Sequence, residues 1–493
     1  MIALLKPTLE QKAIVDANFK DILLVNAYAG TGKTSTLVQF AQARPKEKIL
    51  VLAYNRSMKE EGERKFAHLP NVTVKTMHSL AYGAIGKDYK ERFGKLRAYD
   101  LINFLDDVTK RIRYKSASLL LSYIREFANS AYDMEAYKEI KYNKVERFGK
   151  LDIGTERYIL SKLPEIWERI VNDSSLPFEH DFYLKLYQLS NPALPYSIIM
   201  VDEAQDISGV MIDIVLSQKN AKKVFIGDKY QQIYSWRGAI NSLEMLSTID
   251  GVKTLYLSQS FRCRHDIVQK ANPYLQLLNA SVPFKGLFKA DQSDIQDPLA
   301  VIARTNAGLF DYAVDEIEKN PCVKFHFVGG INSYNFQDLI DIQNLIFQRR
   351  EAIYDKFLKN FESFDKLREY AYEANEIDLE TKIDIVLKHK NENISKLVTE
   401  LESRSTSQKD AEVILTTGHK SKGLEWNRVK ILDDFANLTR MLEENRIILK
   451  KEEINLIYVA ITRAKEKLEI DKDYIINDFT VEKVKRNIFI VQE

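Results

Sequence analysis

The sequence predicts an α/β protein with two cores, each built on a parallel β-sheet and each interrupted by a helical insertion. Short apolar runs, typical of buried parallel strands, alternate with helical segments in both halves of the chain. Two further stretches, residues 86–180 and 350–409, are helical in period and contain few strand-like runs. The length of 493 residues accommodates roughly two to four domains.

The positions of the apolar runs define the expected domains. Strands of the first core are expected at residues 22–26, 48–54, 72–76, 197–203 and 223–228. Strands of the second core are expected at residues 253–260, 299–304, 324–330, 412–417, 428–434 and 468–470. The first core is therefore expected at residues 1–85 and 181–258, with a helical insertion at 86–180. The second is expected at residues 259–334 and 410–493, with a short helical insertion at 335–409.

The stretch NAYAGTGKTS, residues 26–35, is expected to bind phosphate. The apolar run DILLVNA precedes the loop, and the helical segment KTSTLVQFAQA begins at its end. This strand–loop–helix order directs backbone N–H groups and the positive end of a helix toward an anion. Lys33 would reach the outer phosphates, and the Thr34 hydroxyl would bind Mg²⁺. The P-loop pattern asks for glycine where this chain has Ala27, so the pattern alone leaves a chance match open.

A second apolar run, YSIIMVDEAQD at residues 196–206, ends in two acids. A carboxylate at a strand tip can hold the magnesium shell, and its neighbour can take a proton from the attacking water. We therefore expect Asp202 to bind Mg²⁺ and Glu203 to act as the general base. Two acids at the end of a strand are common alone, but together with the GKT loop they are improbable by chance.

An ordered set of motifs continues along the chain: AGTGKTSTLV, VDEAQD, QQIYSWRGA, LSQSFR, HKSKGLEW and VAITRAK. This set resembles superfamily 1 helicases of the UvrD/Rep type and, within that family, the helicase core of the F-box DNA helicases, from about Leu9 to Leu468. In that family alanine is the usual residue at the position of Ala27. The resemblance therefore implies two recombinase-like P-loop NTPase cores, with ATP as substrate and Mg²⁺ as its partner ion.

The resemblance also assigns residues of the ATP site. Gln231 is similar to the residue that senses the γ-phosphate, and Arg262 and Arg463 to two arginines that reach it from the second core. Arginines that arrive only on domain closure connect hydrolysis to motion. The residues expected to bind ATP are Gln11, Ala29, Gly30, Thr31, Gly32, Lys33, Thr34, Ser35, Phe261 and Glu425. A surface glutamine and a core phenylalanine remain alternatives for Gln11 and Phe261, and Asp228 is expected to be structural support.

Single-stranded DNA and its junctions with duplex DNA are the partners that the resemblance implies. Tyr234 and Trp236 are expected to stack on bases, at about 1–3 kcal/mol each, with a buried aromatic pair as the alternative. Backbone contacts, which position a strand without reading its sequence, are expected from Asn55, Arg56, Thr76, His78, Arg304, Asn306, His419 and Lys422. A basic excess at residues 87–115 is either a DNA-facing surface or a solvated helix face.

Composition excludes several classes of protein. Lys and Arg total 72 against 70 Asp and Glu, so the net charge of +2 excludes a wholly basic nucleic-acid coat. No stretch approaches the ~20 apolar residues of a membrane span, and the run at residues 2–5 is too short for a signal peptide. Cys263 and Cys322 are expected to be buried or half-buried free thiols in the reducing cytoplasm.

The expected function is an ATP-dependent DNA helicase and translocase, with the 3′ to 5′ polarity of the resembled family. One rival is an ATPase that strips recombinase filaments and unwinds little, and another is a regulatory ATP switch that recruits a partner. DNA repair, recombination control and antiviral defence are all compatible roles, with a nuclease or a recombinase as partner protein. The chain shows no F-box, a short second insertion and no nuclease-like cluster after the last motif. A ubiquitin-ligase role, autoinhibition through a large 2B subdomain and a fused nuclease are therefore not expected.

Overall fold

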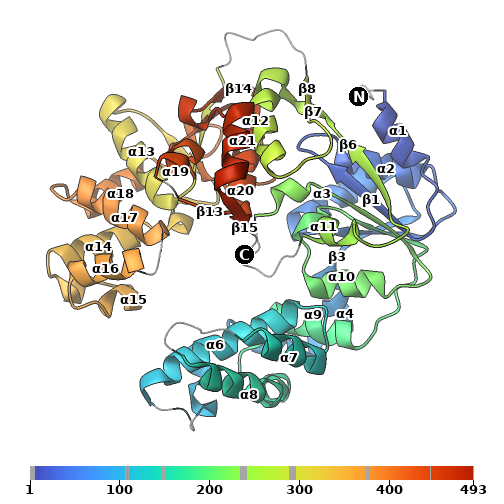
Figure 1. Cartoon of the computed structure of the whole chain (residues 1–493), viewed down its shortest axis with the longest axis horizontal. Coiled ribbons are helices and arrows are strands. Elements are labelled where there is room, and N and C mark those ends of the chain that lie inside the picture. Colours follow the sequence, from blue (N-terminus) through green and yellow to red (C-terminus); the bar gives the residue numbers. More distant parts are fainter. Residues whose placement is uncertain are drawn as a thin grey trace. The chain divides into compact units, whose positions relative to one another are not determined.

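The computed structural model describes residues 6–105, 108, 110–145, 151–233, 241–287, 296–373, 377–444 and 446–491. The chain divides into two compact units, and Figure 1 labels their elements. The first unit comprises Met1–Tyr28 and Gly32–Leu257, and the second comprises Ala29–Thr31 and Ser258–Glu493. Each unit contains a parallel sheet with helices, which confirms the predicted α/β fold with two cores.

Six parallel strands form the sheet of the first unit, in the order β3-β2-β4-β5-β1-β6. Their bounds are β1 Ile22–Ala27, β2 Ile49–Ala53, β3 Val72–Thr76, β4 Ile198–Val201, β5 Lys222–Gly227 and β6 Lys253–Leu257. The first five match the runs predicted for this core. β6 pairs along β1, with Leu23 opposite Lys253, so the assignment of that run to the second core is wrong. A short apolar run does not specify which strand it pairs with.

Both faces of this sheet are buried, which explains why its strands read as continuous apolar runs. Along β1 the side chains of Ile22 and Leu24 join one hydrophobic cluster, while Leu23 and Val25 join another. The second cluster also contains Leu37 of helix α2. The alternation follows from the two-residue period of a strand and places the core on both sides of the sheet.

Helices of the first unit include those of the predicted insertion (Figure 1). Outside the insertion they are α1 Leu9–Val15, α2 Lys33–Gln42, α3 Arg56–Phe66, α4 Met77–Ala84, α10 Gly209–Leu216 and α11 Ser242–Leu246. The insertion and its end contain η1 Gly86–Arg92, α5 Ala98–Leu101, η2 Ile102–Phe104, α6 Lys110–Asn129, α7 Met134–Asn143, α8 Ile153–Asn172 and α9 His180–Leu189. Among the described residues between 86 and 180, strand-like pairing amounts to one isolated bridge, Phe93 to Phe178, so the helical character predicted there is confirmed.

Helix α8 shows how the helices of the insertion pack against one another. Ile159, Leu163, Ile166 and Ile170 recur at helical spacing and are fully buried. They belong to the same hydrophobic cluster as Phe127 of α6. The apolar stripe of each helix is thus covered by its neighbours, as an amphipathic helix requires.

The second unit contains a five-stranded parallel sheet in the order β10-β11-β9-β12-β14. Its strands are β9 Leu299–Ala303, β10 Phe325–Phe327, β11 Val413–Thr417, β12 Trp426–Ile431 and β14 Ala464–Glu469. Two smaller sheets pair β7 Gln259–Arg264 with β8 Lys285–Leu287, and β13 Ile448–Lys450 with β15 Phe489–Val491. The run predicted at 468–470 is the end of β14.

Helices surround this second sheet and build the second insertion (Figure 1). Those outside the insertion are α12 His265–Leu277, α13 Asn306–Lys319, α19 Leu438–Glu443, α20 Lys451–Ile461 and α21 Asp478–Asn487. Those of the insertion are α14 Gln337–Ile346, α15 Lys356–Lys359, α16 Phe364–Glu373, α17 Ile377–Lys388 and α18 Ile394–Ser403. The helical character predicted for residues 350–409 is therefore confirmed.

The two cysteines differ in their surroundings. Both are free thiols, but Cys263 is buried and Cys322 is exposed. The prediction that both are at least half-buried is wrong for Cys322, which lies in the turn between α13 and β10, where no layer covers it. Of the helices in the described ranges, none combines the length and the apolar character that crossing a membrane requires.

Candidate functional site

The predicted phosphate loop and carboxylates lie at one edge of the first sheet. Strands β4, β5 and β1 are neighbours in that order. Lys33 follows β1, Asp202 and Glu203 follow β4, and Asp228 follows β5. Because the strands are parallel, their carboxyl ends meet at the same edge, where α/β sheets bind ligands.

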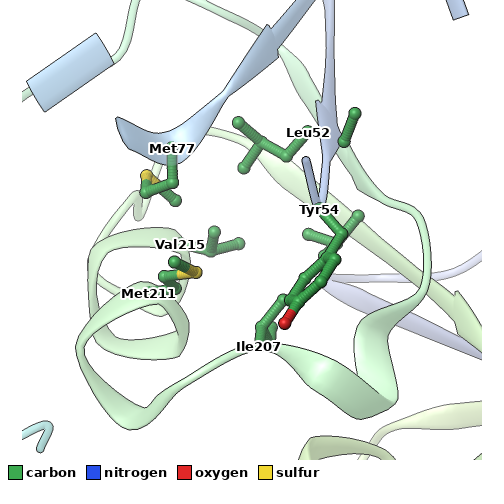
Figure 2. Close-up of a pocket in the computed structure, with 8 residues that line it drawn as sticks. Leu52, Tyr54, Met77, Ile207, Met211 and Val215 are labelled. Carbon is green, nitrogen blue, oxygen red and sulfur yellow. The ribbon is translucent and has the colours of Figure 1, made fainter. Parts of the chain in front are cut away.

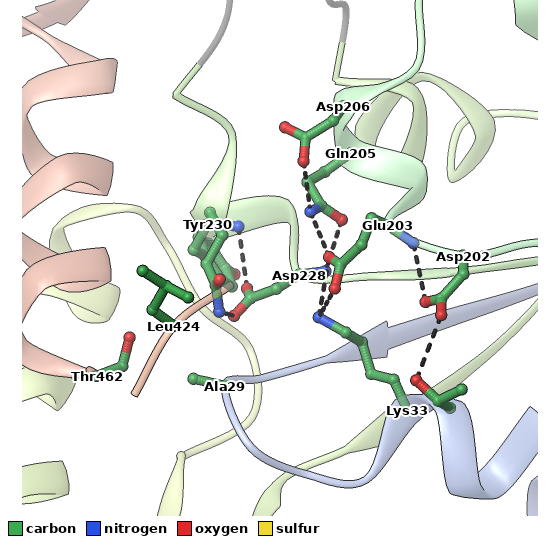
Figure 3. A network of polar contacts seen from close by, with 12 residues as sticks. Ala29, Lys33, Asp202, Glu203, Gln205, Asp206, Asp228, Tyr230, Leu424 and Thr462 are labelled. Atoms are coloured by element: carbon green, nitrogen blue, oxygen red, sulfur yellow. Dashed lines mark hydrogen bonds and ion pairs between the residues drawn. The ribbon is translucent and has the colours of Figure 1, made fainter. Parts of the chain in front are cut away.

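Lys33 is the cation at the centre of this edge (Figure 3). Its Nζ lies 3.0 Å from Oε1 and 3.1 Å from Oε2 of Glu203. Burial alone would lower the pKa of Lys33, but the charges of Glu203, Asp228 and Asp202 outweigh it and raise the pKa. Lys33 therefore remains an ammonium group, as a phosphate ligand must.

Thr34 and Asp202 bring two hard oxygen ligands together. The Thr34 hydroxyl donates to Oδ2 of Asp202 over 3.4 Å. Burial, with the nearby charge of Glu203, raises the pKa of Asp202 to about 6. A hydroxyl and a carboxylate oxygen are ligands suited to Mg²⁺, which takes few protein ligands beside the phosphates of its nucleotide. This donor set fits the predicted magnesium ion.

Glu203 has an unusual backbone conformation. Its φ of 51° lies in the left-handed region, which costs a residue other than glycine roughly 1–3 kcal/mol. Its N–H donates to Oδ1 of Asp202 (2.9 Å), and Gln205 Nε2 donates to its Oε2 (2.7 Å). The bond from Gln205 holds the carboxylate beside Lys33. Gln205 stands two residues after Glu203 in VDEAQD, but its place in that motif alone does not predict these bonds.

Gln231 lies in the same bonded network. It is 4% exposed, and its Nε2 donates to Oδ2 of Asp228 over 2.8 Å. Asp228 also accepts from the N–H of Tyr230, which caps the short turn η4 Lys229–Gln231. The structure therefore brings Gln231 to the same sheet edge as Lys33 and Glu203.

Gln11 and Ser35 lie around the start of α2. The Gln11 amide accepts from the N–H of Thr8 in a capping box and donates to the Thr36 hydroxyl over 3.3 Å. Thr36 in turn donates to the carbonyl of Gly32. Gln11 is thus 5% exposed and bonded to protein groups next to the loop, while Ser35 is exposed.

The loop residues Ala29–Thr31 group with the second unit. Within it, the Ser260 hydroxyl donates to the carbonyl of Ala29 (3.1 Å), and the N–H of Phe261 donates to that of Gly30 (2.7 Å). Gly30 has a φ of +67°, and a Cβ on it would lie 2.4 Å from Cβ of Arg262. Only glycine fits at residue 30.

The two predicted arginine fingers are also bonded within the second unit. Arg262 Nε lies 2.6 Å from Oε2 of Glu425. Arg463 is 1% exposed and donates from Nε to the carbonyl of Val459 and from Nη1 to that of Leu424. A guanidinium has five N–H donors, so contact with a phosphate could use other N–H groups than those bonded to these partners.

In the first unit, the predicted DNA contacts cluster at helix N-termini beside the sheet edge. Asn55 caps α3 after β2, and Thr76 caps α4 after β3. Arg56 is exposed and pairs with Glu60. His78 Nε2 lies 3.1 Å from Oδ1 of Asp181. Burial would raise the pKa of Asp181, but the bonds to His78 and Asn129 lower it.

In the second unit, the predicted DNA contacts follow strands β9 and β11. Arg304 forms a bidentate ion pair with Glu453, with Nη2 to Oε1 at 2.7 Å and Nε to Oε2 at 3.0 Å. Asn306 begins α13, and His419 and Lys422 lie in the turns after β11. Tyr234 and Trp236 lie outside the described residues.

A small cavity in the first unit is separate from this network (Figure 2). It is enclosed mainly by apolar side chains between the sheet and α10, namely Leu52, Ala53, Tyr54, Met77, Val201, Ile207, Met211 and Val215. It offers no charged group to a nucleotide. It is a packing gap, and the candidate site remains the sheet edge around Lys33.

The fold and the loop define the class of P-loop NTPases, and comparison with known proteins identifies the family. The UvrD/REP helicase N-terminal domain matches residues 8–248, and the UvrD-like helicase C-terminal domain matches residues 313–472. The chain therefore belongs to the UvrD-like helicases, and the resemblance inferred from the motifs is confirmed.

Named relatives include eukaryotic and bacterial helicases. The chain is 34% identical to F-box DNA helicase 1 of Gallus gallus, over 94% of this chain and 48% of that protein. It is 31% identical to F-box DNA helicase protein 1 of Schizosaccharomyces pombe, over 94% of this chain and 57% of that protein. It is 23% identical to the ATP-dependent DNA helicase PcrA of Staphylococcus epidermidis, over 88% of this chain and 70% of that protein. The chain thus spans about half the length of the two F-box helicases.

Proposed function

We propose that this chain is an ATP-dependent DNA helicase that moves along single-stranded DNA in the 3′ to 5′ direction. The observation that carries the proposal is the network of Lys33, Thr34, Asp202 and Glu203 at the carboxyl ends of β1 and β4. It combines a phosphate-binding cation, a magnesium donor set and a carboxylate base. Membership of the UvrD-like helicases supports DNA as the partner, and the polarity is carried over from the resembled family.

Hydrolysis in this proposal uses the residues of the first unit. Lys33 binds the outer phosphates of ATP and so gives up its ion pair with Glu203. The Glu203 carboxylate then accepts a proton from the attacking water. The water oxygen bonds to the γ-phosphorus as the bond to the β–γ bridging oxygen breaks, and ADP leaves with that oxygen. Thr34 and Asp202 would hold Mg²⁺, which would neutralise charge on the phosphates. Gln231 contacts the γ-phosphate, and its position changes the conformation of the segment that follows it.

The remaining residues of the ATP site act around the nucleotide. Ala29, Gly30, Thr31, Gly32 and Ser35 supply the loop, Gln11 and Phe261 the adenine contacts, and Glu425 the sugar contact. Arg262 and Arg463 of the second unit stabilise the charge that develops on the transferred phosphoryl group. Because these arginines would contact the phosphoryl group only during hydrolysis, each hydrolysed ATP would be coupled to one domain movement.

DNA binding in this proposal uses both cores. Asn55, Thr76 and Asn306 lie at helix N-termini, where backbone N–H groups favour phosphate. The domains keep the proposed boundaries, with the first core at 1–85 and 181–258 and the second at 259–334 and 410–493, each around its helical insertion. The free thiols of Cys263 and Cys322 support a cytoplasmic location. Repair, recombination control and antiviral defence, with a nuclease or recombinase partner, remain the proposed settings.

A strand-displacement assay tests this function. Duplexes with a 3′ single-stranded tail, a 5′ tail or no tail are incubated with the chain, ATP and Mg²⁺. We expect displacement of the 3′-tailed duplex, and none without ATP or when the magnesium is chelated. Displacement only from the 5′ tail would overturn the polarity. DNA-stimulated ATP turnover without displacement of any duplex would instead indicate a translocase that strips proteins from single strands.

A further inference from the structure

Gln205 is hydrogen-bonded at both ends of its amide within the candidate site, and the proposed catalytic roles do not include it. It is 0% exposed and lies in the short turn η3 Ala204–Asp206, directly after β4 and Glu203. Its Nε2 donates to Oε2 of Glu203 (2.7 Å) and to Oδ2 of Asp206 (3.1 Å). Its Oε1 accepts from the N–H of Asp228 over 3.0 Å. Both the nitrogen and the oxygen of the amide are therefore hydrogen-bonded, and Figure 3 shows Gln205 beside Glu203 and Asp206.

The residues around Gln205 leave room for its amide and hold its turn in place. Gly227, at the end of β5, approaches it so closely that a Cβ on residue 227 would lie 2.2 Å from the Gln205 Oε1. The same Cβ would lie 3.0 Å from the backbone N of Ala204. The turn that contains Gln205 is further held by the Ser242 hydroxyl, which donates to the carbonyl of Ala204. A glycine at 227 thus allows the amide to span the gap between two strands.

A continuous series of bonds runs from Glu203 to Gln231 through this residue. Gln205 joins the Glu203 carboxylate to the main chain of Asp228. The Asp228 side chain then accepts from Gln231 Nε2 over 2.8 Å. All members lie in the first unit, and each of the three links is a direct hydrogen bond.

We propose that Gln205 is a positioning residue that fixes the Glu203 carboxylate for proton transfer and couples its position to the Asp228–Gln231 pair. The inference rests on the proposed ATPase function and deepens it. When Lys33 turns to the phosphates of ATP, the bond from Gln205 keeps the carboxylate in place. When Gln231 moves at the γ-phosphate, the hydrogen bonds through Asp228 and Gln205 also shift the Glu203 carboxylate.

The chemistry of the side chain explains why an amide is required. Glu203 and Asp206 need a donor, whereas the Asp228 N–H needs an acceptor, and among side chains of this length only glutamine offers both. A glutamate would keep the acceptor but place a third carboxylate against the two others. A methionine would keep the shape and lose both kinds of bond.

The test compares Gln205→Met with Gln218→Met. Gln218 is a matched control because it is also a buried glutamine of the first unit, 8% exposed and bonded by both ends of its amide. Its Nε2 donates to the carbonyls of Pro192 and Ile214, and its Oε1 accepts from the N–H of Leu194. It lies in the turn before β5, away from Lys33 and Glu203. The assays are DNA-stimulated kcat and KM for ATP, binding of a fluorescent ATP analogue, and thermal melting.

We expect kcat of Gln205→Met to fall about 10- to 100-fold, the cost of a misplaced catalytic group, while KM and analogue binding change by less than about threefold. Gln218→Met should lose comparable thermal stability but retain the parent kcat. Gln205→Glu, which preserves size and the Asp228 bond, should show the same fall in kcat and serves as the second variant if Gln205→Met does not fold.

Three results overturn the inference in distinguishable ways. A parent chain with normal DNA-stimulated turnover and Gln205 variants that match its kcat would overturn the positioning role alone. Equal losses of kcat in the Gln205 and Gln218 variants, in proportion to their melting temperatures, would do the same, because the effect would then be one of stability. A parent chain without ATP turnover would overturn the proposed function and this inference together.

Discussion

Glu203→Gln is expected to retain ATP and single-strand binding while ATP turnover falls roughly 10²–10⁴-fold, the range for a positioned general base. The amide is nearly isosteric with the carboxylate but cannot accept the proton of the attacking water. Steady-state turnover with saturating single-stranded DNA, together with nucleotide and DNA binding, provides the measurement.

A matched control separates this effect from the loss of an ion pair. Glu179 pairs with Arg125 in the same unit and has similar exposure, 18% against 21% for Glu203. Glu179→Gln removes that pair but lies away from the loop, so its turnover should equal that of the parent. If Glu203→Gln also turns over ATP within about threefold of the parent, Glu203 is not the base.

Lys33→Met is expected to abolish measurable ATP binding at concentrations that saturate the parent and to lower turnover by at least about 10²-fold. The substitution removes the phosphate-binding cation. It also leaves the carboxylates of Glu203, Asp202 and Asp228 without the ammonium that faces them. Binding of a fluorescent ATP analogue and steady-state turnover are the measurements.

The control for this variant is a second buried lysine. Lys223 lies in β5 next to Lys222, is 3% exposed at its side chain and pairs with Asp21 at 2.7 Å. Lys223→Met should cost stability without weakening ATP binding. Analogue binding by Lys33→Met at the affinity of the parent would exclude Lys33 as a phosphate ligand.

The fold class could be predicted from the sequence because parallel strands that are buried on both faces appear as continuous apolar runs. The runs at residues 22–26 and 198–201 are apolar almost throughout and bounded by polar residues, and both became central strands. The run at 253–257 was recognised as a strand but assigned to the wrong sheet. The pairing of β6 with β1 depends on residues more than two hundred positions earlier, so the local sequence does not predict it.

For the candidate site, the sequence predicted the residues whose role follows from their place in a motif. Asp202 and Glu203 directly follow β4, and Lys33 begins the helix after β1, so their convergence could be inferred. The contacts of Gln205 with Asp228 could not, because they depend on how closely β4 and β5 approach at Gly227. The left-handed backbone of Glu203 is likewise a product of that packing, since glutamate does not favour it.

The hydrogen bonds and ion pairs of Arg262 and Arg463 could not be predicted from the sequence either. The resemblance to the helicase family predicts that Arg262 and Arg463 belong to the ATP site. It does not show that Arg262 pairs with Glu425, or that Arg463 donates to backbone carbonyls of its own unit. Such contacts are set by packing within the second unit.

ATP turnover measured without nucleic acid and with single-stranded DNA, duplex DNA or RNA tests the central claim most directly. The proposed function couples ATP turnover to movement along single-stranded DNA. We therefore expect single-stranded DNA to raise kcat by about 10-fold or more, and duplex DNA and RNA to raise it far less. Turnover that is unchanged by single-stranded DNA would contradict a DNA-driven motor.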